Sequence, residues 1–409
     1  MPPLQGPGGC WIAGGSVPEL SAVASRGPRP SVLDVQPGMW RLLAGDRARC
    51  GVSLDPGSDG SMNSARRVMV AGIGGNIGSH LAEHLARMPE IGSLVLIDRD
   101  SYEPRNRDNQ AGVARGPKAT VQARRVRLLN PGLEVISQVA DVEQLPLGQF
   151  RVDLLVSCVD NRRARLHLNQ VSRWLGVPWL DAGVLADGGY ARVTRFSGDP
   201  TGPCLTCGWG PRDYQLVEQR YPCQKGRGLA VPATGASSAL GALAAALLAL
   251  ECQRVLRGDL AADRPVDFVV ASERWQATAT QWVRNPSCQT DHSARRIEPR
   301  PVPMGIHLTE AATEFGATTL AVVGGRFAHR LMCRRCGTIR GAPRLVRTGE
   351  ASLRCPGCRR PAAVVGFGLE AELDLTATAR GTLESLGCVP GDVVAFSNKS
   401  DVRFLEVSQ

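Results

Sequence analysis

Residues 67–79 read RVMVAGIGGNIGS, and this stretch decides the fold class. Its apolar first half predicts a buried strand, and the glycine turn opens a helix that we expect to run through Arg87. Such a turn lets backbone N–H groups approach a phosphate closely at a helix N-terminus, which favours an anion. The strict G-x-G-x-x-G spacing is not met, because Ile77 occupies the third glycine position and Gly78 follows one residue later. The candidate phosphate-binding residues of the turn are Gly72, Gly74, Gly75 and Gly78.

Strands and helices alternate in the sequence that follows the glycine turn. The expected helices cover residues 120–129 and 162–175, and the expected strands cover 93–98, 134–139, 153–159 and 177–181. This alternation predicts an α/β fold with a doubly wound, mostly parallel, Rossmann-like sheet. Residues 266–283 have the pattern of a hairpin, which would add antiparallel strands beside the parallel ones.

The chain divides further by composition. Residues 1–61 lack hydrophobic periodicity and are punctuated by Gly, Pro and Ser, so we expect a disordered, low-complexity extension. Met62, just ahead of the first strand, is an alternative start of the chain. We expect the Rossmann-like domain at 62–296, a proline-rich linker at 297–305 and a smaller C-terminal domain at 306–409.

Composition also bears on the cell compartment and on binding partners. The Ala- and Leu-rich run at 235–250 is shorter than the roughly 20 residues of a membrane span, so we expect a helix packed on the sheet and no membrane. The first thirty residues have no signal-peptide pattern, and the expected location is the cytoplasm. The net charge is +10, and residues 326–360 hold most of the excess, with arginines outnumbering the single acid, Glu350. Such a basic segment would attract an acidic protein face or RNA.

Asp98 closes the second expected strand, about twenty residues after the glycine turn. A carboxylate at this place accepts hydrogen bonds from ribose hydroxyls in dinucleotide-binding proteins. Up to this point, an NAD(P)-dependent Rossmann oxidoreductase fits the sequence as well as any ATP-using enzyme.

Further motifs distinguish these two classes. They are, in chain order, DRD (98–100), NRDNQ (106–110), GPK (116–118), NP (130–131) and CVDN (158–161). In this order and spacing they resemble the ATP site of the ubiquitin-activating-enzyme-like superfamily (ThiF/MoeB/HesA type). The resemblance covers about residues 66–292 and rests on several independent motifs.

The resemblance implies an adenylyltransferase that uses ATP to activate the C-terminal carboxylate of a ubiquitin-like or sulfur-carrier protein, or of a peptide. Lys118 would neutralise the phosphates, Asp160 would hold Mg²⁺, and Asn106 and Gln110 would orient the nucleotide. The alternatives without a functional role are that Lys118 is a solvated lysine and that Asp160 only caps the next helix. The remaining residues that the resemblance assigns to the nucleotide site are Asp98, Asp100 and Asn161.

Two departures from the family pattern stand out. The family usually has Arg before the glutamine of the third motif, and this chain has Asn109 there. Arg105 or Arg107 would supply the missing charge, and we take Arg107 as the candidate. The basic helix that often precedes the first strand is not recognisable, which weakens the expectation of a homodimer.

Thirteen cysteines without a signal peptide favour metal binding or chemistry over disulfides. Cys204 and Cys207 resemble the first half of the family's structural zinc site. For the second half, Cys288 is followed by Asp291 and His292, and we expect His292 as the fourth ligand because histidine is the commoner one. Loss of the site is the remaining alternative.

A cysteine between the two halves of this site is a candidate nucleophile. Cys223, in RYPCQKG, lies in the connection that crosses the adenylation site in the family, where some members carry a cysteine that takes the activated carrier. Neighbouring basic residues would lower the pKa of its thiol. Other members adenylate without such a cysteine, so both roles stay open.

The C-terminal domain contains two further Cys-x-x-Cys pairs, within about residues 330–362. Eighteen residues separate the pairs, and this spacing is a strong signal for a Cys₄ zinc ribbon. Redox use of a pair is the weaker interpretation. The expected ligands are Cys333, Cys336, Cys355 and Cys358.

Three other functions remain open from the sequence. A dehydratase of the same superfamily activates a carboxylate on a modified tRNA base, so the substrate class is not settled. A Rossmann oxidoreductase would have no use for Lys118 and Asp160. Asn109 keeps a non-catalytic partner subunit open, whereas the retained Asp98, Lys118 and Asp160 argue against it.

Overall fold

The computed structural model describes residues 65–218, 235–258, 266–333, 335–340, 343–347, 355, 357–358, 364–377 and 380–409. The expected extension at 1–61 and the candidate nucleophile Cys223 lie outside the described residues.

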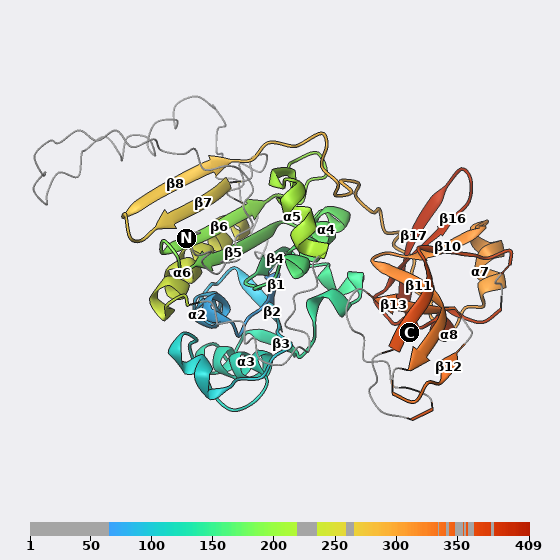
Figure 1. Cartoon of the computed structure of the whole chain (residues 1–409), viewed down its shortest axis with the longest axis horizontal. Helices are drawn as coiled ribbons and strands as arrows, with labels where there is room; N and C mark the ends of the chain where they lie inside the picture. Colours follow the sequence, from blue (N-terminus) through green and yellow to red (C-terminus); the bar gives the residue numbers. More distant parts are fainter. Residues whose placement is uncertain are drawn as a thin grey trace, which may run out of the picture. The chain divides into compact units, whose positions relative to one another are not determined.

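Eight strands form the central sheet in the order β3-β2-β1-β4-β5-β6-β7-β8 (Figure 1). The five parallel strands are β1 (Arg66–Ala71), β2 (Ile91–Ile97), β3 (Glu134–Gln138), β4 (Leu154–Ser157) and β5 (Trp179–Leu185). The antiparallel extension consists of β6 (Tyr190–Phe196), β7 (Val266–Ala271) and β8 (Gln276–Gln281). The expected Rossmann-like sheet with an antiparallel extension is confirmed, and β6 is an additional strand.

Successive side chains of a strand point to opposite faces of the sheet, so the central strands contribute to two hydrophobic cores, one on each face. Val68 and Val70 belong to the core under α2 (Asn76–Leu85), α3 (Lys118–Leu129) and α6 (Ser238–Leu256). Met69 and Ala71 belong to the core on the other face, under α4 (Arg162–Leu175). The sheet is therefore covered on both faces, as a doubly wound fold demands.

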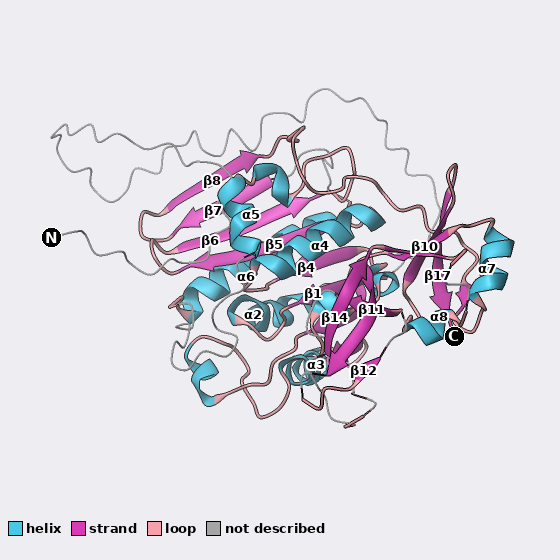
Figure 2. Ribbon diagram, turned by 45° about the vertical axis from the view of Figure 1, so that its right-hand side comes forward, coloured by secondary structure: helices cyan, strands magenta, loops and turns pink. Residues whose placement is uncertain are grey.

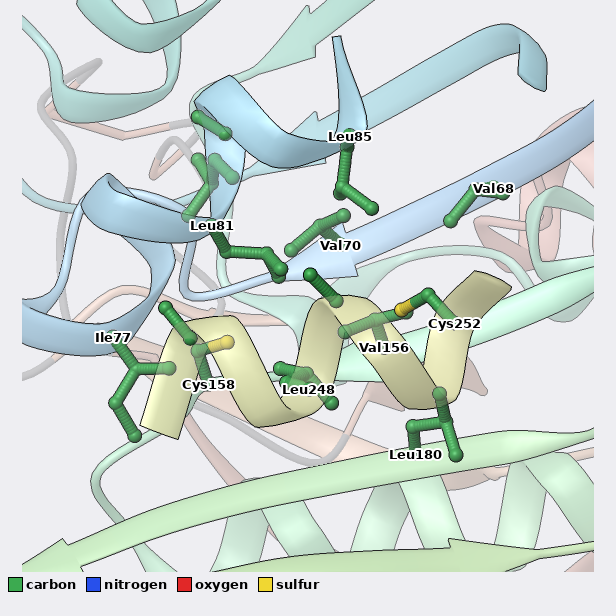
Figure 3. Close-up of a cluster of buried hydrophobic side chains, with 14 of the residues drawn as sticks. Val68, Val70, Ile77, Leu81, Leu85, Val156, Cys158, Leu180, Leu248 and Cys252 are labelled. Atoms are coloured by element: carbon green, nitrogen blue, oxygen red, sulfur yellow. The ribbon is translucent and has the colours of Figure 1, made fainter. Parts of the chain in front are cut away.

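Helix α6 is apolar around most of its circumference. Within the described residues it alone is long and apolar enough to cross a membrane, by length and composition only, and half of it is buried. Leu248 and Cys252 of α6 lie in the same core as Val70 and Val156 of the sheet (Figure 3). This packing accounts for its apolar composition without a bilayer.

Element boundaries differ from the expected ones by a few residues. Helix α3 begins at Lys118, directly after Pro117, rather than at residue 120. Proline fits the start of a helix because the missing N–H has no intrahelical partner there. This start places the Lys118 side chain at the helix N-terminus.

The C-terminal domain is built on two small sheets. A five-stranded sheet has the order β15-β10-β16-β17-β9, and β11 pairs with β12, β13 and β14 in the other. Figure 2 shows β11 and β14 side by side. Its strands are β9 (Val302–Pro303), β10 (Thr319–Val322), β11 (Gly325–Cys333), β12 (Ile339–Arg340), β13 (Arg344–Arg347), β14 (Val364–Glu370), β15 (Glu372–Asp374), β16 (Val393–Ser397) and β17 (Val402–Ser408), and its helices are α7 (Leu308–Phe315) and α8 (Leu383–Leu386). Strand β9 lies within the expected linker and pairs in parallel with β17.

Candidate functional site

The glycine turn between β1 and α2 is held by close backbone contacts. Gly72 has a φ of +78°, and a Cβ there would lie 2.7 Å from the carbonyl oxygen of Cys158. A Cβ on Gly78 would overlap the carbonyl oxygen of Gly72. Gly78 thus allows the close approach of helix and turn that the third glycine gives in the standard motif. The N-cap of α2 is Gly75, which has no side chain to satisfy the first amides of the helix.

Asp98 joins this turn to the end of β2. Its Oδ2 accepts a hydrogen bond from the Gly74 amide at 2.9 Å, and its Oδ1 accepts one from the Asp100 amide at 3.0 Å. The residue is only 8% exposed. Burial raises the pKa of the Asp98 carboxyl, and the two amides and the nearby Lys118 ammonium oppose that shift. The carboxylate is therefore fixed in place beside the glycine turn.

Lys118 is buried rather than solvated, with 8% of the residue exposed. Its aliphatic stem packs on Gly74, where any Cβ would overlap it. Its Nζ lies 5.6 Å from the centre of the Tyr102 ring, and its amide donates to the Asp100 carbonyl at 2.8 Å. The alternative of a solvated lysine at a helix start does not hold.

A short 3₁₀ helix, η1 (Pro104–Asp108), lies between Asp98 and Lys118 in the chain. The Asn106 side chain caps it by accepting from the Glu103 amide at 2.8 Å, and the Gln110 amide donates to the Asn106 carbonyl at 2.9 Å. Arg105 forms an ion pair with Glu103 at 2.6 Å. Arg107 is exposed and has no ion-pair partner among the described residues. Of the two arginines, Arg107 is thus the one left for a ligand.

Asp160 and Asn161 divide two tasks at the start of α4. Asn161 is the N-cap, since its Oδ1 accepts from the Ala164 amide at 2.8 Å. Asp160 is exposed, and its carboxylate does not cap α4, so the alternative of a purely capping aspartate does not hold. Burial lowers the pKa of the Arg99 guanidinium, but the carboxylates of Asp141 and Asp100, with a smaller contribution from Asp160, raise it on balance.

The topology gathers these residues at one edge of the sheet. Strands β1, β2 and β4 are neighbours, and the order of connections reverses between β1 and β4. The Gly72 amide donates to the Ile97 carbonyl at 2.8 Å, and the Cys158 amide donates to the Ala71 carbonyl at 2.9 Å. Ligands of open α/β sheets bind outside the carboxyl ends of the strands at such a reversal.

A second group of side chains converges from η4 (Leu205–Gly208) and the chain after β8. The Cys204 sulfur lies 3.7 Å from that of Cys288 and 3.8 Å from that of Cys207. Nε2 of His292 lies 3.7 Å from the Cys207 sulfur, and its Nδ1 lies 3.2 Å from the Pro200 carbonyl. All four ligand atoms lie within 4.8 Å of one another. A backbone acceptor on the second ring nitrogen is the usual partner of a metal-binding histidine.

Asp291, the alternative ligand, is engaged elsewhere. Its Oδ1 accepts from the Ser293 amide at 2.9 Å, and its carboxylate forms an ion pair with Arg295. Two residues of α4 that no sequence motif marks also support the site. Asn169 accepts from the Leu205 amide at 2.9 Å, and the buried Arg173 donates to the carbonyls of Asp199 and Pro203. Nothing in the sequence distinguishes these polar residues from solvated ones.

The four ribbon cysteines also converge. The Cys333 and Cys358 sulfurs are 4.0 Å apart, and those of Cys336 and Cys355 are 3.5 Å apart. Their ligand atoms all lie within 4.8 Å of one another. Cys336 is exposed, whereas Cys333 and Cys355 are buried.

Two buried ion pairs near the nucleotide site were not anticipated. Arg165 of α4 pairs with Asp181 of β5 at 3.0 Å, and Ser157 donates a hydrogen bond to the same carboxylate. Arg162 pairs with Asp213 of α5 (Pro211–Glu218) at 2.8 Å. Both arginines follow Asp160 closely in the chain, so they fix the start of α4 to its surroundings.

Comparison with known proteins agrees with the motifs. Ubiquitin-like modifier-activating enzyme 5 of Culex quinquefasciatus is 30% identical over 139 residues, which are 29% of this chain and 34% of that protein. SAMP-activating enzyme E1 of Haloferax volcanii is 32% identical over 163 residues, 38% of this chain and 57% of that protein. The chain spans about a third of the length of the enzyme 5 relatives that it matches.

Among solved structures, Escherichia coli MccB with ATP aligns with 55% of this chain and 65% of its own, at 20% identity and a TM-score of 0.42. The family model described as ThiF family matches residues 58–290, more than half of the chain. The resemblance inferred from the motifs is confirmed, and the chain belongs to the ThiF family.

Proposed function

We propose that the chain uses ATP to adenylate the C-terminal carboxylate of a small ubiquitin-like or sulfur-carrier protein, or of a peptide. The observation that carries this proposal is the placement of Asp98, Lys118 and Asp160 around the glycine turn at one edge of the sheet. The comparisons support it, because the two relatives are named ubiquitin-like modifier-activating enzyme 5 and SAMP-activating enzyme E1.

The nucleotide would be held by the turn and by Asp98. The uncapped N-terminus of α2 offers amides and a favourable dipole to the phosphates. Each oxygen of Asp98 accepts one backbone amide and has a further lone pair for a ribose hydroxyl. A fixed carboxylate loses little entropy when it binds, which is the benefit of the buried position.

The reaction builds up negative charge on the phosphates. A carboxylate oxygen of the carrier attacks the α-phosphorus, the bond to the bridging oxygen of the β-phosphate breaks, and pyrophosphate leaves. The attacking carboxylate is already ionised at neutral pH, so no general base is needed. Catalysis then consists mainly of positioning and charge stabilisation.

Lys118 and Asp160 would stabilise the negative charge on the phosphates in different ways. The Lys118 side chain starts from the first turn of α3, its stem packs on Gly74 and its ammonium lies over the Tyr102 ring, from where it would neutralise phosphate oxygens. The exposed carboxylate of Asp160 is of the type that Mg²⁺ takes together with substrate phosphates. When bound, Mg²⁺ supplies positive charge to the leaving pyrophosphate.

Arg107 takes the place of the arginine that the family has at position 109. It belongs to the same short helix as Asn106, which is itself capped and fixed. Arg105 is the weaker candidate because its guanidinium is already paired with Glu103.

We also propose two zinc ions, one in each cysteine cluster. Thiolates around a tetrahedral zinc, with Zn–S distances of about 2.3 Å, lie roughly 3.8 Å apart. The sulfur–sulfur distances of 3.5 to 4.0 Å in the two clusters fit that value. Transfer of the activated carrier to Cys223 is a further proposal, as is a homodimer.

The test is adenylate formation with labelled ATP. The full chain is incubated with α-labelled ATP, Mg²⁺ and a small ubiquitin-like protein ending in Gly-Gly. We expect label on the protein's C-terminus and release of pyrophosphate. Binding of NAD(P) without adenylate formation would contradict the proposal and favour a Rossmann oxidoreductase instead.

A further inference from the structure

Two side chains from different parts of the nucleotide site meet at one backbone carbonyl. Nδ2 of Asn76 lies 3.3 Å from the Ala236 oxygen, and Nδ2 of Asn109 lies 3.4 Å from the same atom. Asn76 also donates to the Ser237 carbonyl at 3.2 Å. A carbonyl oxygen has two lone pairs, so it can accept both amides at once.

Both asparagines lie within stretches where the chain departs from the patterns of its motifs. Three residues stand between Gly74 and Gly78 where G-x-G-x-x-G has two, and Asn76 is the middle one. Asn109 stands where the family usually has arginine. Although 33 residues separate them in the chain, both departures lead to the residues just before α6.

The surrounding packing fits this arrangement. A Cβ on Gly241 would overlap the Asn76 amide, so glycine is what lets that amide lie against the first turn of α6. His80 of α2 lies 3.0 Å from the Ser238 hydroxyl, and Ser237 caps α6 through its own hydroxyl. Ala236 is 3% exposed, so its carbonyl depends on protein donors rather than on water.

We propose that Asn76 and Asn109 are positioning residues that form an amide clamp on the Ala236 carbonyl. The clamp fixes the glycine turn and the turn after η1 to the same point, and thereby sets their separation. Asn109 then does not replace a phosphate ligand, because its amide is used in the clamp. This inference rests on the proposed function, since those two turns are the ones assigned to the nucleotide.

The test measures ATP affinity in the full chain with a fluorescent ATP analogue and Mg²⁺, which needs neither carrier nor turnover. Asn76→Leu and Asn109→Leu keep the side-chain shape and remove the donor. Asn109→Leu should weaken binding about two- to tenfold, the range of one ordinary hydrogen bond. Asn76→Leu should weaken it at least as much, because it also loses the hydrogen bond to the Ser237 carbonyl. Either single variant leaves the carbonyl one donor. The double variant leaves it none, and should weaken binding by more than the product of the two single effects.

Asn398→Leu is the matched control. Its Nδ2 donates to the Gly316 carbonyl at 2.8 Å in the C-terminal domain, the same kind of contact away from the nucleotide motifs. We expect unchanged ATP affinity in this variant, whatever its melting temperature. A purely structural role of the asparagines would lower the melting temperature of the ATP-free protein and leave the affinity of the folded protein unchanged.

The outcomes separate the clamp from the function on which it rests. If the wild type binds the ATP analogue and the three variants bind it equally well, the clamp is overturned. If the wild type does not bind it, the proposed function fails as well. Should the double variant not fold, the single variants decide, because equal affinity in both of them contradicts the clamp.

Discussion

Gly78 packs directly on the carbonyl oxygen of Gly72, although it stands one position later than the motif requires. The extra residue is absorbed within the turn, and the close approach of helix and strand is kept. The role of the third glycine is therefore defined by the lack of room for a Cβ at this contact, and not by its exact position in the sequence motif.

Gly78→Ala should disrupt the turn, because the new Cβ would overlap the Gly72 oxygen and the Ile73 backbone. Overpacking of this kind costs about 1–3 kcal/mol, and we expect a lower melting temperature together with lost ATP binding. Gly75→Ala is the control for stability: its φ is −72° and its Cβ would find no atom closer than 3.5 Å. Equal melting temperatures for the two variants would contradict this account.

The two cysteine clusters should hold two zinc ions per chain, measured by atomic emission on the purified protein. Cys288→Ser and Cys355→Ser should each lower the content by about one ion, because thiolate is the ligand that each cluster requires. Cys252, buried in the core of the sheet and outside both clusters, gives a control that should retain both ions as Cys252→Ala. A zinc content below one in the wild type would refute both sites.

His167 should make stability fall in acid. Burial lowers the pKa of its imidazole from 6.5 to about 4, and its Nε2 is buried without a hydrogen-bond partner among the described residues. Below pH 6.5 the imidazole is protonated in the unfolded chain, whereas in the folded protein it stays neutral until about pH 4. Stability is thus lost as the pH falls through this window, by a few kcal/mol at most, at about 1.4 kcal/mol per pKa unit.

His167→Phe removes the titrating group and keeps an aromatic ring against Phe150, which the histidine contacts edge-on. Denaturant unfolding at pH 8, 6.5 and 5 should show a smaller loss of stability in this variant than in the wild type. Asp141 and Arg163 also act on the imidazole, in opposite directions, and remain in both proteins. Parallel pH curves for the two proteins would rule out the buried histidine as the cause.

Much of the parallel sheet is predictable from apolar runs, but β6 is not. Its sequence, YARVTRF, carries Arg192 and Arg195, which are buried and paired with Asp267 and Glu251. Because the partners of these arginines are more than fifty residues away in the chain, no local sequence pattern shows that the arginines are buried in a strand. The five-stranded sheet of the C-terminal domain escaped prediction for a related reason, since β10 and β15 are short and far apart in the chain.

The site was predictable where short motifs carry the chemistry. The glycine turn, Asp98, Lys118 and Asp160 follow from local spacing, and the structure places them at one edge of the sheet. The contacts of Asn109 with Ala236 cross more than a hundred residues, so sequence alone offers no signal for them.

Arg107 and Arg105 form a matched pair within one short helix. Arg107→Ala should weaken ATP binding about tenfold or more, as expected for a lost charged hydrogen bond. Arg105→Ala should have a smaller effect, because its guanidinium is paired with Glu103. The measurement is titration with the fluorescent ATP analogue, and the reverse order of effects would assign the phosphate contact to Arg105.

The most direct test of adenylation is Mg²⁺-dependent pyrophosphate–ATP exchange, with a small ubiquitin-like protein ending in Gly-Gly as acceptor. Asp160→Ala should reduce the exchange by at least about a hundredfold, because it removes the carboxylate proposed to hold the ion that balances the transition-state charge. Glu134→Gln, which removes an exposed charge from the opposite end of the parallel strands, should exchange at the wild-type rate. Wild-type exchange in the Asp160→Ala variant would contradict the assignment of the site.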